Sequence, residues 1–476
     1  MSLTSEQEAK VLQIIAAFED GKRLGDLPKA AGSNPFDLVV EVLDRDGESK
    51  QAGLAAMLPY VEEQCAYGIE WDTAVSSPLC TRIGNTSLHK SLPIQSRMRG
   101  CLLSDGGTVV EYLNPTNWRA HALDGSRGQV MVEIPAHWRR FEAVGTVRRI
   151  WLSEYPLPGY HFVPLSYVSA YEAALERSSG KLCSVANMGE DYRGGNNQNE
   201  WDGTHRSLLG RPVTVQSRTA FRTAARKRGA EWNEYVYDVH KTIFWLYYVE
   251  YANRNCQTAF TAQKDAGGFP QGGLGNGVTN WNGTAWSSFN GYHPFVPCGY
   301  TDEYGNGTGV KDYKITNEDG SDLFTVSVPR YRGIENPFGH VWKWTDGVNV
   351  EISSEAEGGT SKVYVCSDPS KFSDSGYDGY SLRGLEARNE GYVNELIFGE
   401  YGDIMPSKAG GSSTAHWCDY HYTNIPGSGK ALRGVLFGGS ANIGASAGFA
   451  YASSNYVPSN TDAYFGSRLC FIPKSA

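Results

Sequence analysis

The stretch "GGSANIGASAGFAYASSNYVPSNTDAYFGSRLCF", from Gly438 to Phe471, follows neither common pattern of secondary structure. Its apolar residues lack the three- and four-residue spacing of a helix, and large apolar side chains do not alternate with polar ones as in a half-buried strand. Glycine and alanine are instead interleaved with serine, asparagine, tyrosine, aspartate and phenylalanine. We expect the small residues to set tight loop paths and the residues between them to be presented for binding.

The composition is that of an acidic, aromatic-rich globular protein. The 476 residues carry a net charge of −9, with 12% aromatic and 20% charged residues. The length predicts two or three domains, and the acidic balance argues against nucleic acid as a partner. No apolar run is long enough for a membrane helix, and the N-terminus lacks a signal-peptide pattern. We therefore expect synthesis in a cytoplasm and no membrane insertion.

The nine cysteines are odd in number and scattered, without a Cys-x-x-Cys pair. This pattern argues against a disulfide framework or a thiolate zinc site and favours buried, reduced thiols.

Three segments are distinguished along the chain. Residues 1–30 predict an amphipathic helix, begun by a capping box at Thr4 or Ser5, and a linker. Residues 31–138 contain short β-type runs between turn residues and predict a β-rich spacer domain. Residues 139–476 form the last predicted domain, which is largely loop after residue 267; long ordered loops are usually functional.

The strongest helical signal lies between residues 217 and 256. We expect Ser217 to cap a first helix that stops at Gly229. The aromatic spacing predicts a buried face on a second helix, formed by Phe244, Tyr247, Tyr248 and Tyr251. We interpret the cations near the end of the first helix as complementing its dipole rather than as an anion site. These cations are Arg222, Arg226, Lys227 and Arg228.

Three motifs in fixed order carry a resemblance to a known family. "ENPFGHVWKWTDGV" (335–348) is followed by "LRGVLFGGS" (432–440) and by the terminal "FGSRLCF" (465–471). This order resembles the formylglycine-generating-enzyme branch of the C-type lectin fold, and it implies an α+β fold with a C-type lectin domain over residues 139–476. The positions that match are Asn336, Gly339, Trp342, Trp344, Arg433, Gly439, Ser440, Arg468 and Cys470. We interpret the two tryptophans as core, because residues i and i+2 share one face of a strand.

The resemblance leaves two alternatives to a simple binding protein. A formylglycine-type metal oxidase uses two cysteines close in sequence near the C-terminus to hold copper, but Cys470 has no near neighbour and would have to meet Cys418 in space. The His-x3-His-x-Glu cluster of the related iron enzymes is absent. A calcium-dependent lectin would need sugar motifs that are missing; Asp302 and Asn306 in "TDEYGNGTG" could hold structural calcium, although a solvated loop is the favoured interpretation. We expect no enzyme activity, no cofactor and no metal.

The C-terminal stretch resembles the variable region of diversity-generating-retroelement target proteins, known from phage tail-fibre adhesins and from gut Bacteroides phages or prophages. In that family, adenine mutagenesis of asparagine codons never yields Lys, Glu, Gln, Met or Trp, and residues 434–467 contain none of these five. Codons for glycine and alanine have no adenine in their first two positions, so a glycine and alanine framework would survive unchanged. The resemblance places the variable region at about residues 430–470.

The resemblance implies a non-enzymatic receptor-binding protein, associated with a virion tail or a cell surface after synthesis in the bacterial cytoplasm. Its partner would be a protein or glycan ligand on a bacterial surface, and a homo-oligomer such as a trimer would add avidity. Tyrosine, serine and asparagine are the side chains that paratopes favour, and Tyr451, Tyr456, Tyr464 and Phe465 are the expected anchors. The expected ligand-binding residues are Tyr420, Tyr422, Asn424, Ser440, Asn442, Ile443, Ser446, Tyr451, Ser453, Asn455, Tyr456, Ser459, Asn460, Asp462, Tyr464 and Phe465.

Overall fold

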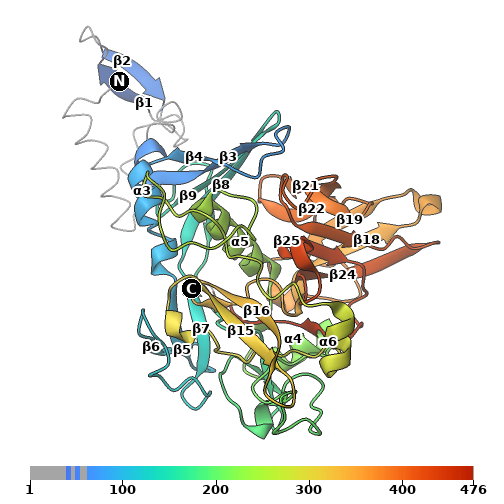
Figure 1. Ribbon diagram of the computed structural model, residues 1–476. Helices are drawn as coiled ribbons and strands as arrows, with labels where there is room; N and C mark the ends of the chain where they lie inside the picture. The colour runs from blue at the N-terminus through green and yellow to red at the C-terminus, as the bar shows by residue number, and fades with distance from the viewer. Residues whose placement is uncertain (1–38, 44–48, 54–61, 475–476) are drawn as a thin grey trace.

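The computed structural model describes residues 39–43, 49–53 and 62–474, in which strands predominate and helices are few (Figure 1). This part of the chain is a β-rich α+β fold, as the sequence predicts at that level. The helix predicted in residues 1–30 lies outside the described residues. No helix among the described residues is long and apolar enough to cross a membrane. The α-helices that lie wholly within the described residues are α3 (Thr86–Ser91), α4 (Arg218–Arg226), α5 (Tyr237–Tyr251) and α6 (Gly283–Asn290).

The largest sheet has nine strands and includes residues from each of the three motifs of the resemblance. Its strands pair mostly antiparallel, but β23 runs parallel to β25 and β26 runs parallel to β18. The order across the sheet is β20 (Ser381–Leu385), β19 (Ser361–Val365), β18 (Trp342–Ser353), β24 (Lys430–Gly438), β25 (Gly448–Ser454), β23 (Tyr420–Thr423), β21 (Gly391–Phe398) and β22 (Asp403–Ala409), with β26 (Phe465–Gly466) beside β18. Trp342 and Trp344 of β18 are buried, which confirms their interpretation as core.

A six-stranded sheet joins residues near both ends of the described chain. The order across it is β14 (Trp232–Glu234), β27 (Leu469–Phe471), β11 (Ser166–Ser169), β7 (Gln129–Ile134), β5 (Arg99–Leu103) and β6 (Val109–Tyr112). The C-terminal strand β27 therefore lies between strands that are more than two hundred residues away in sequence.

A five-stranded sheet spans the expected boundary between residues 138 and 139. Its order is β10 (His161–Val163), β8 (His137–Val144), β9 (Val147–Ser153), β3 (Ala66–Asp72) and β4 (Thr81–Gly84). The boundary falls inside β8, which pairs with β9 and β10. Residues 62–138 therefore share both of these sheets with the rest of the chain.

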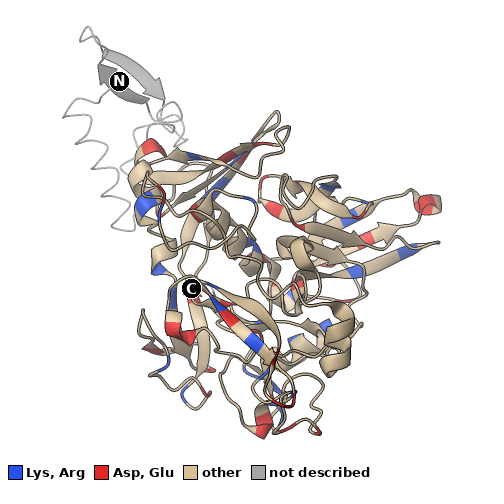
Figure 2. Cartoon of the chain, in the orientation of Figure 1, with Lys and Arg blue, Asp and Glu red and all other residues tan. Residues whose placement is uncertain are grey.

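The smaller elements complete the described fold. The short sheets are β1 (Val39–Leu43) with β2 (Ser49–Gly53), β12 (Ala174–Glu176) with β13 (Lys181–Cys183), and β15 (Gly309–Thr316) with β16 (Asp322–Tyr331) and β17 (Ile334–Glu335). The 3-10 turns are η3 (Gln95–Arg97), η4 (Glu190–Tyr192), η5 (Asp302–Tyr304), η6 (Glu355–Glu357), η7 (Pro369–Lys371) and η8 (Gly444–Ser446). Basic and acidic residues are interspersed along the same strands and loops (Figure 2).

The helix α5 lies in the middle of the fold, between the five-stranded and nine-stranded sheets (Figure 1). The sequence predicts one buried face, but the structure buries every residue of α5 except Asp238, because sheets cover the helix on more than one side. Its buried charges have partners, as burial requires. Glu250 accepts hydrogen bonds from Arg332 and Tyr331, and Lys241 lies 3.2 Å from Asp403.

The helix α4 begins as predicted, with the Ser217 hydroxyl accepting a hydrogen bond from the backbone N–H of Ala220. The cations at its end do more than complement the helix dipole. Arg222 pairs with Asp346 and Asp374, Arg226 donates to the carbonyl of Pro369, and Arg228 pairs with Asp105. Protein groups therefore already bind these three guanidinium groups.

Candidate ligand-binding site

The base of the site is built from the buried motif residues. Arg468 is fully buried, and its guanidinium donates hydrogen bonds to the backbone carbonyls of Ser169, Glu335 and Asn336. Asn336 has a positive φ of 46°, so its carbonyl belongs to an irregular turn rather than to a strand ladder. Arg468 thereby joins the C-terminal motif to the segment before β18 and satisfies carbonyls that would otherwise be buried without partners.

Glycines in the C-terminal stretch pack where a side chain has no room. A Cβ atom on Gly448 would lie 2.1 Å from Oδ1 of Asp419, and one on Gly466 would lie 2.9 Å from Cγ2 of Val341. Gly439 has a φ of +84°, and a Cβ there would lie 2.9 Å from that of Ala447. These close approaches explain the small residues of the stretch as a packed framework.

Two loops leave this framework on either side of β25. Residues 439–447 are held by backbone hydrogen bonds from Ala441 to His340, from Trp281 to Ala441 and from Gly444 to Thr279. This first loop exposes Asn442 and half-buries Ile443 and Ser446.

The second loop, residues 455–464, is held in the same way. Gly434 donates to the carbonyl of Tyr456, Arg218 to that of Pro458 and Val215 to that of Asp462. The loop exposes Ser459 and Asn460 and half-buries Asn455, Tyr456, Asp462 and Tyr464.

The strand β23 and the residue after it supply the third part of the site. Tyr420 and Tyr422 point to the same side of β23 because they are two residues apart. Tyr422 is 39% exposed, Asn424 is exposed and Tyr420 is half-buried. Trp417 is buried, as expected for a supporting residue.

The three parts meet around one hydrophobic cluster. Tyr420, Ile443, Tyr456 and Tyr464 pack at the rim of a cluster that includes buried Trp342. Neighbouring rings in the cluster touch edge to face. Ring centroids are 5.9 Å apart for Tyr420 and Tyr451, 4.9 Å for Tyr456 and Phe465, and 5.2 Å for Tyr464 and Phe465.

Four of the expected ligand-binding side chains are buried and do not form a surface: Ser440, Tyr451, Ser453 and Phe465. Tyr451 and Ser453 lie on β25, which has strands on both sides, and the ring of Trp342 lies 4.6 Å from that of Tyr451. Phe465 lies on β26 against Trp344 and is covered by Tyr456 and Tyr464. The expectation that Tyr451 and Phe465 are exposed anchors is therefore wrong, and both support the rim residues instead.

Two further tyrosines reach the same rim from distant segments. Tyr392 of β21 contacts the ring of Tyr420, and its hydroxyl accepts a hydrogen bond from Ser446 at 3.5 Å. Tyr292, after α6, contacts the ring of Tyr464. Neither lies in a sequence pattern that indicates binding, because only the tertiary fold brings them beside the C-terminal loops.

The rim presents hydroxyl and amide groups and few charges. Burial raises the pKa of Tyr420 and of Tyr464, so both phenols are neutral at physiological pH. Burial also raises the pKa of Asp462, against the opposing effect of hydrogen bonds from Ala463 and Tyr464. Such a surface suits a ligand rich in hydrogen-bonding groups.

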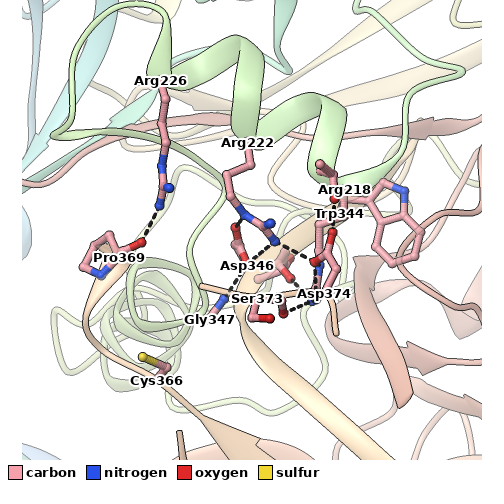
Figure 3. A network of polar contacts seen from close by, with 12 residues as sticks. Arg218, Arg222, Arg226, Trp344, Asp346, Gly347, Cys366, Pro369, Ser373 and Asp374 are labelled. Atoms are coloured by element: carbon pink, nitrogen blue, oxygen red, sulfur yellow. Dashed lines mark hydrogen bonds and ion pairs between the residues drawn. The ribbon is translucent and has the colours of Figure 1, made fainter. Parts of the chain in front are cut away.

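A largely buried ion network connects α4 to β18 and to the loop around Asp374 (Figure 3). Arg218 and Arg222 of α4 both bind Oδ1 of Asp374, each at 2.6 Å. Arg222 also pairs with Asp346 of β18. Arg218 further donates to the carbonyl of Val348, so the helix, the strand and the loop around Asp374 are held as one unit.

The two cysteines that an oxidase would need lie in different parts of the fold, and only Cys470 belongs to a strand. Cys470 is on β27 of the six-stranded sheet, whereas Cys418 precedes β23 and lies beside Arg254 and Asp419. Burial raises the pKa of each thiol to about 12, so neither is a thiolate at neutral pH. All nine cysteines, which fall within the described residues, are unpaired.

The loop considered for calcium uses its oxygens within the protein. Asp302 is buried rather than solvated, and both its carboxylate oxygens accept hydrogen bonds from the hydroxyl of Tyr171. Asn306 accepts from the backbone of Gly100 and from Trp118. Within residues 62–474, no cluster of three or more His, Cys, Asp or Glu side chains has a metal-binding arrangement.

Comparison with known proteins adds little to this geometry. No family model matches the chain, and no curated protein matches it. Among solved structures, the Major Tropism Determinant U1 variant matches with a TM-score of 0.22 and 12% identity, over 71% of this chain and 72% of that chain. At this identity and TM-score the likeness carries no argument about what the chain does.

Proposed function

We propose that the chain is a non-enzymatic receptor-binding protein of the C-type lectin fold, of the retroelement-diversified adhesin type. Its binding surface is the rim formed by the first loop, the second loop and β23. The ligand is a protein or glycan on a bacterial surface. Association with a virion tail or a cell surface, and a homo-oligomer such as a trimer, belong to the same proposal.

One observation carries this proposal: glycines of the C-terminal stretch are tightly packed, whereas polar residues of its loops are exposed. Gly448 and Gly466 pack against neighbours with no room for a Cβ, whereas Ser459 and Asn460 between them and Asn442 before them are exposed. Substitutions at exposed loop positions change the surface without disturbing the core. A framework of this kind would tolerate diversification of its loops.

The revised site contains the exposed and half-buried members of the expected set, together with two added tyrosines. Ser440, Tyr451, Ser453 and Phe465 are assigned to support. The proposed contact residues are Tyr292, Tyr392, Tyr420, Tyr422, Asn424, Asn442, Ile443, Ser446, Asn455, Tyr456, Ser459, Asn460, Asp462 and Tyr464.

The proposal predicts that removing exposed rim side chains abolishes binding without unfolding the protein. Labelled full-length chain is applied to a panel of intact bacterial strains and to a glycan microarray. We expect the triple variant Tyr422→Ala, Asn442→Ala and Asn460→Ala to bind at least tenfold more weakly than the parent, because aromatic anchors and their polar neighbours dominate interfaces. Its thermal unfolding should stay unchanged.

A matched control carries Tyr112→Ala, Asn114→Ala and Asn117→Ala, which are also exposed and lie on or just after β6, an edge strand of the six-stranded sheet. This control should bind as the parent does. Equal loss of binding in both variants, or full binding by the rim variant, contradicts the proposed site.

A second test examines the DNA beside the gene. We expect a near-identical copy of the segment for residues 430–470 there, which differs at adenines and lies next to a reverse-transcriptase gene. Its differing codons should fall on the contact residues from Asn442 to Tyr464 and not on Gly448 or Gly466.

A further inference from the structure

A cavity of about 350 Å³ lies between the five-stranded sheet and the start of α5, and it shares no lining residue with the rim. Its walls come from β8, β10 and β11, from the first two turns of α5, and from single residues that include Arg383 and Tyr401. The volume is within the range of pockets that hold small organic molecules. The rim and its proposed ligand leave this cavity unexplained.

Arg139 of β8 faces the cavity with few protein partners. The residue is 8% exposed, and its one hydrogen bond within the described structure runs from Nη1 to the hydroxyl of Thr242 at 3.1 Å. No carboxylate of the described residues forms an ion pair with it. The adjacent Arg140 differs, since it binds Glu62 at 2.6 Å and Glu142 at 2.8 Å.

A buried guanidinium without an anion is costly, so such a group usually has a partner. Burial lowers the pKa of Arg139, and the fields of Asp238 and Asp403 oppose this effect only in part. Both of these carboxylates are already engaged by Lys241, at 3.0 Å and 3.2 Å. Arg139 therefore offers unused hydrogen-bond donors at the cavity wall.

The charges around the cavity leave one positive charge in excess. Three cations, Arg139, Lys241 and Arg383, face two carboxylates, Asp238 and Asp403. At the margin, the Glu400 carboxylate lies 3.4 Å from His161, but its side chain is 66% exposed, so solvent screens its charge from the interior of the cavity. A monoanion would balance the excess, whereas a dianion would also meet the repulsion of the two carboxylates.

The rest of the wall is apolar and aromatic. Phe141 lies beneath Arg139, with its ring centroid 5.6 Å from the guanidinium carbon. Val163 and Val239 are buried and also line the cavity, and Val163 lies on the same face of the sheet as Arg139. In addition, α5 begins at Tyr237, its N-cap residue Val236 supplies no side-chain cap, and the positive end of the helix dipole favours an anion.

We propose that this cavity binds a small organic carboxylate with a flat apolar body. The carboxylate pairs with Arg139, and the apolar body packs against Phe141 and Val163, which lie on the same face of the sheet as Arg139. The arginine fork matches a carboxylate with two parallel hydrogen bonds. The site stands independently of the proposed adhesin function, because it uses none of the same residues.

The test titrates three probes into the full-length protein by calorimetry: 2-naphthoate, the neutral 2-naphthamide and inorganic phosphate. We expect saturable binding of 2-naphthoate, at least tenfold weaker binding of 2-naphthamide, and no measurable binding of phosphate. Arg139→Gln should weaken 2-naphthoate at least tenfold and leave 2-naphthamide unchanged. Absence of saturable 2-naphthoate binding, or equal affinity for the amide, overturns the proposal.

A control variant and a second readout separate binding from folding. Arg149→Gln, on the neighbouring β9 and paired with Glu70, should bind 2-naphthoate as the parent does. Without ligand, the Tm of Arg139→Gln should equal or exceed that of the parent, because an unpaired buried charge is removed. Addition of 2-naphthoate should raise the Tm of the parent and of Arg149→Gln, but not that of Arg139→Gln. A large fall in the Tm of Arg139→Gln without ligand would show a structural role and overturn the site.

Discussion

Residues in the C-terminal stretch divide by what surrounds them, not by their type. Gly448 and Asn442 lie six residues apart, yet the first has the carboxylate of Asp419 against its Cα and the second is exposed. Asp419 is buried, and its pKa is raised by burial against the opposing hydrogen bonds from Ala450 and Cys256. The framework glycine therefore packs directly against a buried acid that is held by hydrogen bonds from Ala450 and Cys256.

At this scale we predict that Gly448→Ala destabilises the protein strongly. The new Cβ would lie 2.1 Å from Oδ1 and 2.3 Å from Cγ of Asp419, so β25 or the loop before β23 must shift. Overpacking of this kind costs about 1–3 kcal/mol of unfolding free energy. Urea unfolding followed by circular dichroism measures it.

Gly427→Ala is the matched control, because its Cβ would meet no atom within 4 Å and its backbone has no positive φ. This control should be neutral or slightly stabilising, since alanine restricts the unfolded chain more than glycine does. If Gly448→Ala proved as stable as Gly427→Ala, the close packing of the framework would be refuted.

The sequence predicts this framework but not which of the residues between its members are exposed. Tyr451 and Tyr456 look alike in the sequence, five residues apart in the same stretch. Tyr451 is covered by Trp342, from a strand more than a hundred residues away, and Tyr456 is left at the rim. Burial of this kind depends on tertiary neighbours, which local spacing does not encode.

Among the elements, α4 and β18 are joined by charge rather than by apolar packing alone. The carboxylate of Asp374 forms ion pairs with two arginines of α4, and one of them, Arg218, has a fully buried side chain. Removing one partner of such a network leaves another charge buried without compensation. We predict that Asp374→Asn lowers the free energy of unfolding by about 2 kcal/mol, less than for a fully buried pair because Asp374 is partly exposed.

Thermal and urea unfolding measure this loss. Asp378→Ala, an exposed aspartate in the same loop, is the control and should change stability little. A loss as large in Asp378→Ala would mean that the loop, and not the ion network, is responsible.

The same network gives a pH dependence with a definite sign. Burial raises the pKa of Asp374, but Arg218 and Arg222 outweigh it, so the pKa lies below its ordinary value. A lowered pKa in the folded state means that the stability from this group is complete above the ordinary value, about 3.9, and is lost as the pH falls through the lower one. The difference in free energy of unfolding between the parent and Asp374→Asn should therefore be constant near neutral pH and become smaller below about pH 4. A gap that widens on acidification would contradict the assignment.

The two central helices show what local patterns could and could not predict at the scale of elements. Ser217 marks the start of α4 because a capping hydroxyl acts on the next few residues. The aromatic spacing of α5 predicts a helix, but its burial on all sides follows from the sheets packed around it. Glu250 and Lys241 have the appearance of surface residues in the sequence, and only their partners Arg332 and Asp403 explain why they are buried.

For the whole molecule, the sheets tie distant segments into one structure. The strand β27 pairs with β11 and β14, and β11 pairs with β7 from the segment expected to form a separate spacer. The composition of the sequence changes near residue 138, which suggests a domain boundary. Composition does not predict which strands pair across that position. The described residues 62–474 should therefore unfold together, unlike domains joined by a linker.

Phe471→Ala tests this unity. The ring of Phe471 is buried on β27, 5.0 Å from that of Trp232 and directly over Gly107, so its removal should cost about 3–5 kcal/mol. Because the sheets share one cooperative structure, hydrogen exchange should accelerate equally in β5 and β7 and in β18 and β24 of the nine-stranded sheet. Leu382→Ala, at an exposed position of β20, should leave exchange unchanged in both sheets. If β5 and β7 lost protection while β18 and β24 kept theirs, the chain would consist of two independently stable units. The stability of the loops at the rim would then not depend on β5 and β7.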